Sequence, residues 1–156
     1  MKAFGPVLIL IGVVYACAFV YLSLVDTSIF SLRGYPIHNG GDSGEYATLG
    51  QNIAEHGTFS LTLDPAKPEM FRSPGYPFFL APLYLIDHSY YLAIFVQVLL
   101  VLGSALLIYL IGSSFLPRPL STVAALVFAL DPATMFYTLS IWSDTLFVFL
   151  VLLAVY

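Results

Sequence analysis

Charged residues are scarce in this 156-residue chain. It contains five Lys and Arg residues, nine Asp and Glu residues, three His residues and a single cysteine. Nucleic-acid binding depends on clustered Lys and Arg, so five basic residues and a net charge of −4 argue against it. Cys17 has no second cysteine to pair with, so no disulfide can form within the chain.

Apolar residues make up 60% of the chain, and its mean hydropathy is +0.92. Soluble domains typically contain about 45–50% apolar residues, so we expect an all-α, polytopic membrane protein that forms one membrane unit over residues 1–156. A crossing helix needs about 20 apolar residues, which predicts about four transmembrane helices and a long outer loop carrying juxtamembrane helices. The expected spans are residues 4–25, 90–113, 119–137 and 139–156, and the outer loop is 26–88. A cleaved signal peptide is the alternative for the first span, but its apolar region is only about 7–15 residues long.

The basic residues suggest an orientation. With the amino terminus inside, Lys2 and Arg118 lie on the cytoplasmic side, in agreement with the positive-inside rule, and the acidic residues lie at the outer face. Arg33, Lys67 and Arg72 then lie outside, which counts against this orientation. We expect a multi-pass protein of the plasma or inner membrane with its site on the outer face.

The outer loop holds a predicted helix over residues 42–56. Asp42 suits its N-cap, Glu45 completes a capping-box pattern, and Gly57 is a stop signal. One apolar stripe that can rest on the membrane or on neighbouring spans is formed by Tyr46, Leu49 and Ile53. From the pattern alone, Asp42 and Glu45 are as readily caps as functional residues.

The same helix start could bind a ligand. Gly40, Gly41 and Gly44 leave room for close approach to the backbone, and helix N-termini attract phosphate. Arg72 has the forked geometry that binds phosphate. Its alternative role is an interfacial anchor to lipid phosphates.

Residues 76–86 are apolar but too short to cross a membrane. Pro77 and Pro82 interrupt the segment, so we expect a helix lying at the membrane interface. Its aromatic belt would be Phe78, Phe79 and Tyr84.

Asp144 borders the last apolar run. A carboxylate at membrane depth costs about 2–3 kcal/mol, so Asp144 either faces a polar cavity or caps the fourth span. Asp131-Pro132 also resembles a helix start. If the helix begins there, Asp144 lies about 18 Å along it.

A metal site has little support in the sequence. His38, His56 and His88 lack a metal-ligand spacing, and His56 suits a helix C-terminus. A divalent metal ion shared by Asp42, Glu45 or a histidine is the weaker alternative.

Four motifs, in this order, resemble the GT-C superfamily of membrane glycosyltransferases, in the branch of protein mannosyltransferases and lipid A aminoarabinose transferases. After the first span come an acidic residue, a Tyr and an Ala/Leu-rich helix, and then an Arg-x-Pro-Gly-Tyr-Pro element. Next come a Pro with a Tyr near the outer end of span three and a Ser-acid pair opening span four. The residues concerned are 42–60, 72–77, Pro132 with Tyr137, and Ser143-Asp144.

The resemblance implies inverting transfer of a sugar from a polyprenyl-phosphate donor to an acceptor hydroxyl, an acceptor that the sequence does not identify. Asp42 matches the family's catalytic acidic residue and would act as general base. Arg72 would hold the donor phosphate, Asp144 would position acceptor, sugar or metal, and Glu45, Tyr46 and Tyr76 would complete the substrate-binding residues. Ser43 stands where protein mannosyltransferases have a second acid, which points away from protein O-mannosylation.

Family members have many more spans, and the last span here has no polar flank, so we expect the chain to be the amino-terminal portion of a larger protein. Membrane lipid is a further expected partner. We also expect Asp42 and Asp144 to converge over one pocket. The alternative is a non-catalytic small membrane protein, either a partner subunit or an inactive fragment.

Overall fold

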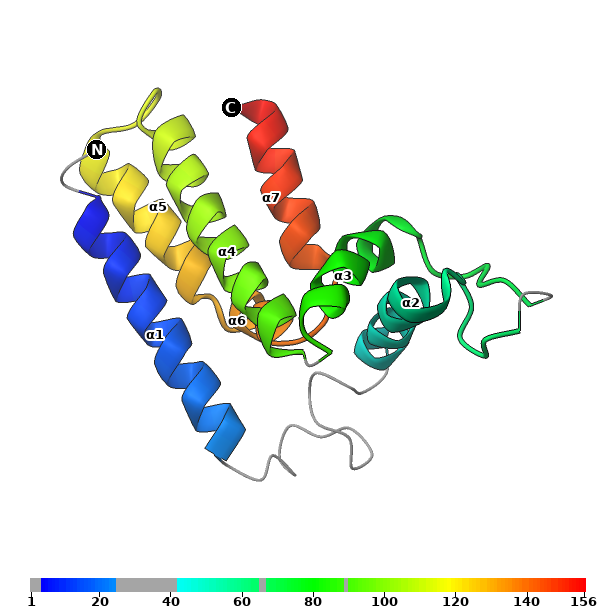
Figure 1. Ribbon diagram of the computed structural model, residues 1–156. Helices are drawn as coiled ribbons and strands as arrows, with labels where there is room; N and C mark the ends of the chain where they lie inside the picture. The colour runs from blue at the N-terminus through cyan, green and yellow to red at the C-terminus, as the bar shows by residue number, and fades with distance from the viewer. Residues whose placement is uncertain (1–3, 25–41, 65–66, 89) are drawn as a thin grey trace. The chain divides into compact units, whose positions relative to one another are not determined.

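The computed structural model describes residues 4–24, 42–64, 67–88 and 90–156, and all regular elements in these ranges are α-helices (Figure 1). The all-α prediction is therefore confirmed for the described residues. The helices are α1 (Gly5–Leu24), α2 (Asp42–His56), α3 (Gly75–Ile86), α4 (Tyr91–Gly112), α5 (Arg118–Leu130), α6 (Pro132–Thr138) and α7 (Asp144–Val155).

The helices belong to two compact units. The bundle unit contains the described residues 4–24, 97–139 and 144–156. The α2–α3 unit contains residues 42–64, 67–88, 90–96 and 140–143. Helix α4 contributes residues to both units.

Close side-chain contacts hold the bundle unit together. The rings of Phe4 and Tyr109 stack with centroids 4.1 Å apart, which joins the start of α1 to α4. The buried Tyr15 hydroxyl donates to the Ala129 carbonyl of α5 at 2.8 Å. In Figure 1, α1, α5 and α4 follow one another side by side. These contacts combine apolar packing with a satisfied buried hydroxyl, as a water-free interior requires.

The segment predicted as the third span, 119–137, consists of two helices with a bend of 56° between them. Asp131 ends α5 and caps α6, because its carboxylate accepts from the Thr134 backbone N–H at 3.0 Å. Pro132 follows at the start of α6, where its missing N–H costs nothing. The predicted helix start at Asp131-Pro132 is thus confirmed, but α6 ends at Thr138 and does not continue to Asp144.

In the α2–α3 unit, α2 covers residues 42–56 as predicted. Gly57 ends the helix in the left-handed region with φ of 65°. The Gly57 N–H donates to the Ile53 carbonyl at 3.0 Å, which is the 5→1 bond of the αL C-cap motif. The stop signal read from the sequence therefore has a conformational basis.

The face that α2 buries differs from the predicted one. Its most buried residues are Ser43, Ala47, Leu49 and Gly50, rather than Tyr46, Leu49 and Ile53. Helices α2 and α3 pack so closely that a Cβ on Gly50 would lie 2.8 Å from Leu80 Cβ and 3.0 Å from the Tyr84 ring. Small residues, which a hydropathy stripe does not reveal, set this interface.

Helix α3 also corrects two expectations. It continues through Pro82, which is exposed, and Pro77 lies in the first turn, where a missing N–H is tolerated. Phe78 is exposed as predicted, but Tyr84 is buried under α2 and does not belong to an exposed aromatic belt.

Among the described residues, α4 is long and apolar enough to cross a membrane. Helices α5 and α6 are together long and apolar enough as well, if the bent pair counts as one span. The described apolar stretches Gly5–Tyr21, Gly75–Ile86 and Asp144–Val155 each contain fewer than 18 residues, which is too short for a candidate membrane span.

Candidate functional site

Arg72 lies at the centre of a charged cluster in the α2–α3 unit. Its Nη2 donates to Asp42 Oδ1 at 2.6 Å, and its Nε donates to Glu45 Oε2 at 2.5 Å. The two acids lie in the first turn of α2, whereas Arg72 precedes α3 in the sequence. One guanidinium therefore joins two carboxylates at a helix start.

The charges in this cluster do not cancel, because two carboxylates meet one cation. The pairing raises the pKa of the Arg72 guanidinium above its usual range, through the hydrogen bond that it donates to Glu45 first and the one that it donates to Asp42 second. The side chains remain partly exposed, at 23% for Arg72, 41% for Asp42 and 43% for Glu45. A guanidinium has five N–H donors, so donors remain for a ligand that approaches from solvent.

Aromatic rings border the charged cluster. The Arg72 guanidinium carbon lies 5.6 Å from the centroid of the Tyr46 ring, within the range of a cation–π contact. Tyr46 meets Tyr76 edge to face, with centroids 5.2 Å apart. Tyr76 is buried and also stacks with Phe79. These contacts anchor the cluster to α3.

Hydrogen bonds to Glu69 hold the backbone of the segment that leads into Arg72. Glu69 Oε1 accepts from the backbone N–H groups of Phe71 and Arg72 at 2.7 and 3.2 Å. The Glu69 N–H in turn donates to the Phe59 carbonyl at 2.9 Å. The segment that carries Arg72 is thus tied to the residues that follow α2.

Ser43, next to Asp42, has a structural role that the sequence did not reveal. It is fully buried, and its hydroxyl accepts from the Ile141 backbone N–H at 3.1 Å. This hydrogen bond ties residues 140–143 to the first turn of α2. A serine after an acidic helix start offers no hint of a partner 98 residues away.

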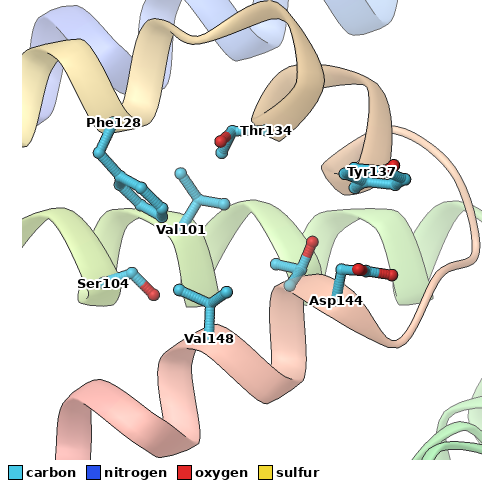
Figure 2. A pocket seen from close by; sticks show the side chains of 8 residues that line it. Val101, Ser104, Phe128, Thr134, Tyr137, Asp144 and Val148 are labelled. Carbon is cyan, nitrogen blue, oxygen red and sulfur yellow. The ribbon is translucent and has the colours of Figure 1, made fainter.

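Asp144 is the first residue of α7 and lines a pocket in the bundle unit (Figure 2). The pocket has a volume of about 50 Å³. It is lined by Val101 and Ser104 of α4, Phe128 of α5, Thr134 and Tyr137 of α6, and Asp144, Thr145 and Val148 of α7. Asp144 itself is exposed, and Figure 2 shows it beside Tyr137 at one end of the pocket.

A row of buried neutral polar groups lies along the same helices. Gln97 Nε2 donates to the Thr138 carbonyl at the end of α6 at 2.8 Å. The Thr138 hydroxyl donates to the Thr134 carbonyl at 2.6 Å and lies 3.5 Å from the Thr145 hydroxyl. Gln97 and Ser104 are visible in the sequence as the polar interruptions of an apolar span, and this is the signal that points to them.

The divalent metal ion shared by Asp42, Glu45 or a histidine stays a prediction. Asp42 and Glu45 already bind a guanidinium, and the described part of the chain contains no group of three or more His, Cys, Asp or Glu residues placed to hold a metal. His56 and His88 instead lie 3.7 and 3.2 Å from the Glu55 carboxylate. His38, Gly40, Gly41 and Lys2 lie outside the described residues.

Five predicted site residues thus meet in one cluster: Asp42, Glu45, Tyr46, Arg72 and Tyr76. Asp144 belongs to the other unit, and its convergence with Asp42 stays a prediction. Comparison of the chain with protein-family models, with curated proteins and with solved structures finds no match.

Proposed function

We propose that this chain is the amino-terminal portion of a polytopic, GT-C-like membrane glycosyltransferase of the plasma or inner membrane. Its reaction is inverting transfer of a sugar from a polyprenyl-phosphate donor to an acceptor hydroxyl at the outer face. The observation that carries the proposal is the bridge from Arg72 to Asp42 and Glu45. It joins two of the four motifs that support the resemblance, at a partly exposed position.

The chemistry requires one base and one phosphate ligand, and the cluster offers both. The Asp42 carboxylate takes the proton of the acceptor hydroxyl as the acceptor oxygen bonds to the sugar's anomeric carbon. The bond from that carbon to the donor phosphate breaks, and its electron pair leaves with the phosphate. Arg72 stabilises the departing phosphate through N–H groups that the carboxylates do not use. Attack opposite the leaving group inverts the anomeric centre.

The tyrosines and Glu45 have supporting roles in this proposal. Glu45 holds the Arg72 guanidinium by its Nε, at 2.5 Å, and so orients the other N–H groups. Tyr46 and Tyr76 supply ring faces and edges beside the charged groups. Asp144 positions the acceptor or the sugar.

Exposed apolar side chains support placement of the bundle unit in a membrane. Large apolar residues face outward along α1, α4, α5 and α7, and helices that are apolar on the outside suit lipid better than water. Clear examples, each more than half exposed, are Ile9, Val127 and Phe147. Several further spans from the remainder of the protein would pack against these faces.

The proposal is tested with the full reading frame expressed in membranes and supplied with a panel of radiolabelled polyprenyl-phosphate sugars. We expect Asp42→Asn to lower transfer at least about 100-fold, because a neutral amide cannot accept the proton. Arg72→Lys should also lower transfer, because a lysine cannot bridge two partners in a fixed geometry. The anomeric configuration of the product reports inversion.

Asp64→Asn is the matched control. Asp64 is an acid of the same unit that lies 3.9 Å from Lys67, and its variant should retain transfer. If the chain is instead a non-catalytic partner subunit, no donor in the panel is consumed. Full transfer by Asp42→Asn would remove Asp42 from the catalytic role.

A further inference from the structure

Helix α3 is apolar on both of its sides. One side packs against α2 through the buried Leu80 and Tyr84 (Figure 1). The other side, which we call the outer face of α3, consists of Phe78, Leu85 and Ile86, each more than half exposed. Residues at positions i, i+7 and i+8 lie on one face of a helix, so these three side chains form a continuous apolar strip.

Helix α2 has a different character, although it belongs to the same unit. Its large apolar residues Tyr46, Leu49 and Ile53 are all buried or half-buried. Its acids Asp42 and Glu45 have side chains that are 41 and 43% exposed. The α2–α3 unit therefore has a polar side, formed by α2, and an apolar side, formed by α3.

The segment before α3 adds two further apolar side chains. Met70 is 81% exposed and Phe71 is 97% exposed. The backbone that carries them is held in place, because Glu69 Oε1 accepts from the N–H groups of Phe71 and Arg72. A large aromatic ring held in water loses the free energy that burial of its apolar surface would provide. An apolar surrounding would supply that burial.

The start of α4 indicates which surrounding this is. Residues 90–96 belong to the same unit as α3, and Tyr91 and Phe95 within them are more than half exposed. Helix α4 is long and apolar enough to cross a membrane, and it begins only five positions after Ile86. Helix α3 has 12 residues and extends only about 18 Å, too short to cross. It therefore lies near the level at which α4 would enter the lipid.

We propose that the outer face of α3, together with Met70 and Phe71, binds the surface of the bilayer that α4 crosses. Helices with an apolar face are held about 5–10 Å deep, at the boundary between head groups and acyl chains. The α2 side of the unit remains in water. This surface replaces the predicted aromatic belt, because Phe78 belongs to it whereas Tyr84 faces α2. The proposal rests on the membrane crossing stated under the proposed function, but not on glycosyl transfer.

Lipid contact is measured by quenching of a fluorophore on single cysteines. The full reading frame, with Cys17 and every other cysteine replaced by alanine, carries Phe78→Cys, Leu85→Cys or Phe71→Cys. Each variant is labelled with bimane and placed in phosphatidylcholine nanodiscs. A fraction of the lipid carries a nitroxide, either close to the head group or close to the end of the acyl chain. Ile86→Cys reports on the same face if Phe78→Cys does not fold.

Two control positions complete the set. Thr48→Cys lies on α2, where Thr48 is half-buried. We expect the shallow nitroxide to quench the labels at positions 71, 78 and 85 at least about threefold more strongly than the label at position 48, as a helix at the lipid boundary requires. Leu99→Cys lies on the exposed side of α4, eight residues or about 12 Å beyond its start. The deep nitroxide should quench the label there.

The outcomes separate the proposal from its premise. Quenching at position 99 without quenching at positions 78 and 85 would overturn the lipid-binding face alone. The emission wavelength would then show whether water or a protein segment covers it. Equal quenching at positions 48 and 78 would show that α2 is also immersed, which overturns the two-sided arrangement.

The remaining outcomes concern single parts. Absence of quenching at position 71 alone would remove Met70 and Phe71 from the surface. Absence of quenching at position 99 would overturn the membrane crossing of α4 and, with it, this proposal. Sugar transfer is measured separately on the unlabelled protein, so its failure would leave the quenching result unchanged.

Discussion

The two units treat polar groups in opposite ways. In the α2–α3 unit, full charges meet where water still reaches them, in the contacts of Arg72 with Asp42 and Glu45. In the bundle unit, the buried polar side chains are neutral, as with Gln97, Thr138 and Ser104. Burying a charge costs far more than burying a hydrogen-bonded amide or hydroxyl. Chemistry that needs charge is therefore more easily placed in the α2–α3 unit.

The units are alike in one respect, because each contains a glycine that permits close helix packing. A Cβ on Gly50 would meet Leu80 and Tyr84 of α3, and a Cβ on Gly103 would lie 2.8 Å from the Phe149 ring of α7. The neighbours differ in how far they can move. Leu80 Cβ is fixed to the backbone, whereas the Phe149 ring can rotate away.

The largest effect is expected for Gly50→Ala. The methyl group collides with Leu80 Cβ, so α2 and α3 must separate, at a cost of about 2 kcal/mol in the free energy of unfolding. Limited proteolysis of residues 57–73, measured against temperature, follows this unit. Gly75→Ala is the control, because a Cβ there meets nothing within 4 Å. Equal melting of the two variants would contradict the packing argument.

A smaller effect is expected for Gly103→Ala in the bundle unit. The Phe149 ring can yield, so we expect a loss of about 1 kcal/mol. Adding Phe149→Leu should restore part of this loss, because it removes the ring atoms that the methyl group meets. Thermal unfolding in detergent, for the single and double variants, measures the coupling. Additive effects would show that the two residues do not meet.

The smallest effect at neutral pH is expected for Tyr84→Phe. The Tyr84 hydroxyl is buried without a hydrogen-bond partner among the described residues, so its removal should change stability by less than about 1 kcal/mol, in the stabilising direction. Burial raises the pKa of the Tyr84 phenol. The neutral form thus stabilises the fold fully below about pH 10, the ordinary tyrosine value, and this contribution falls as pH rises above it.

Alkaline titration separates Tyr84 from the other tyrosines. The wild-type chain should lose stability faster than Tyr84→Phe between about pH 10 and 12, because the unfolded phenol ionises there while the buried one stays neutral. The difference between the two unfolding curves is the measured quantity. Parallel curves over this range would show that the Tyr84 phenol is not buried as described.

The sequence predicted the helices of the α2–α3 unit well because their ends carry local signals. Helix α2 begins at Asp42 as predicted, and Gly57 marks its end by cap chemistry that depends on neighbouring residues alone. The sequence placed Arg72, Asp42 and Glu45 in the same outer loop, but it did not predict that their side chains would be in contact. The bridge itself depends on the packing of α2 against α3, which Gly50 permits. The spacing of apolar residues in the sequence does not predict this packing.

The bundle unit was less predictable in its details. A uniformly apolar segment clearly indicates a helix, but it does not indicate which face of that helix is buried. The break between α6 and α7 at residues 139–143 occurs in a run of moderately apolar residues without Gly or Pro. Within this break the Ile141 N–H donates to the distant Ser43 hydroxyl, and a pattern of neighbouring residues cannot reveal such a contact.

The bend at Asp131 limits how α5 and α6 can be accommodated by lipid. Thirteen residues of α5 extend only about 20 Å, some 10 Å less than the hydrocarbon thickness of a bilayer. The seven residues of α6 diverge by 56°, so they add only about 6 Å along the axis of α5 and leave part of that deficit. Hydrophobic mismatch of this kind is relieved by local thinning of the bilayer. If α5 and α6 form one span, as the proposed function has it, the leaflet beside Asp131 would be thinner than its surroundings.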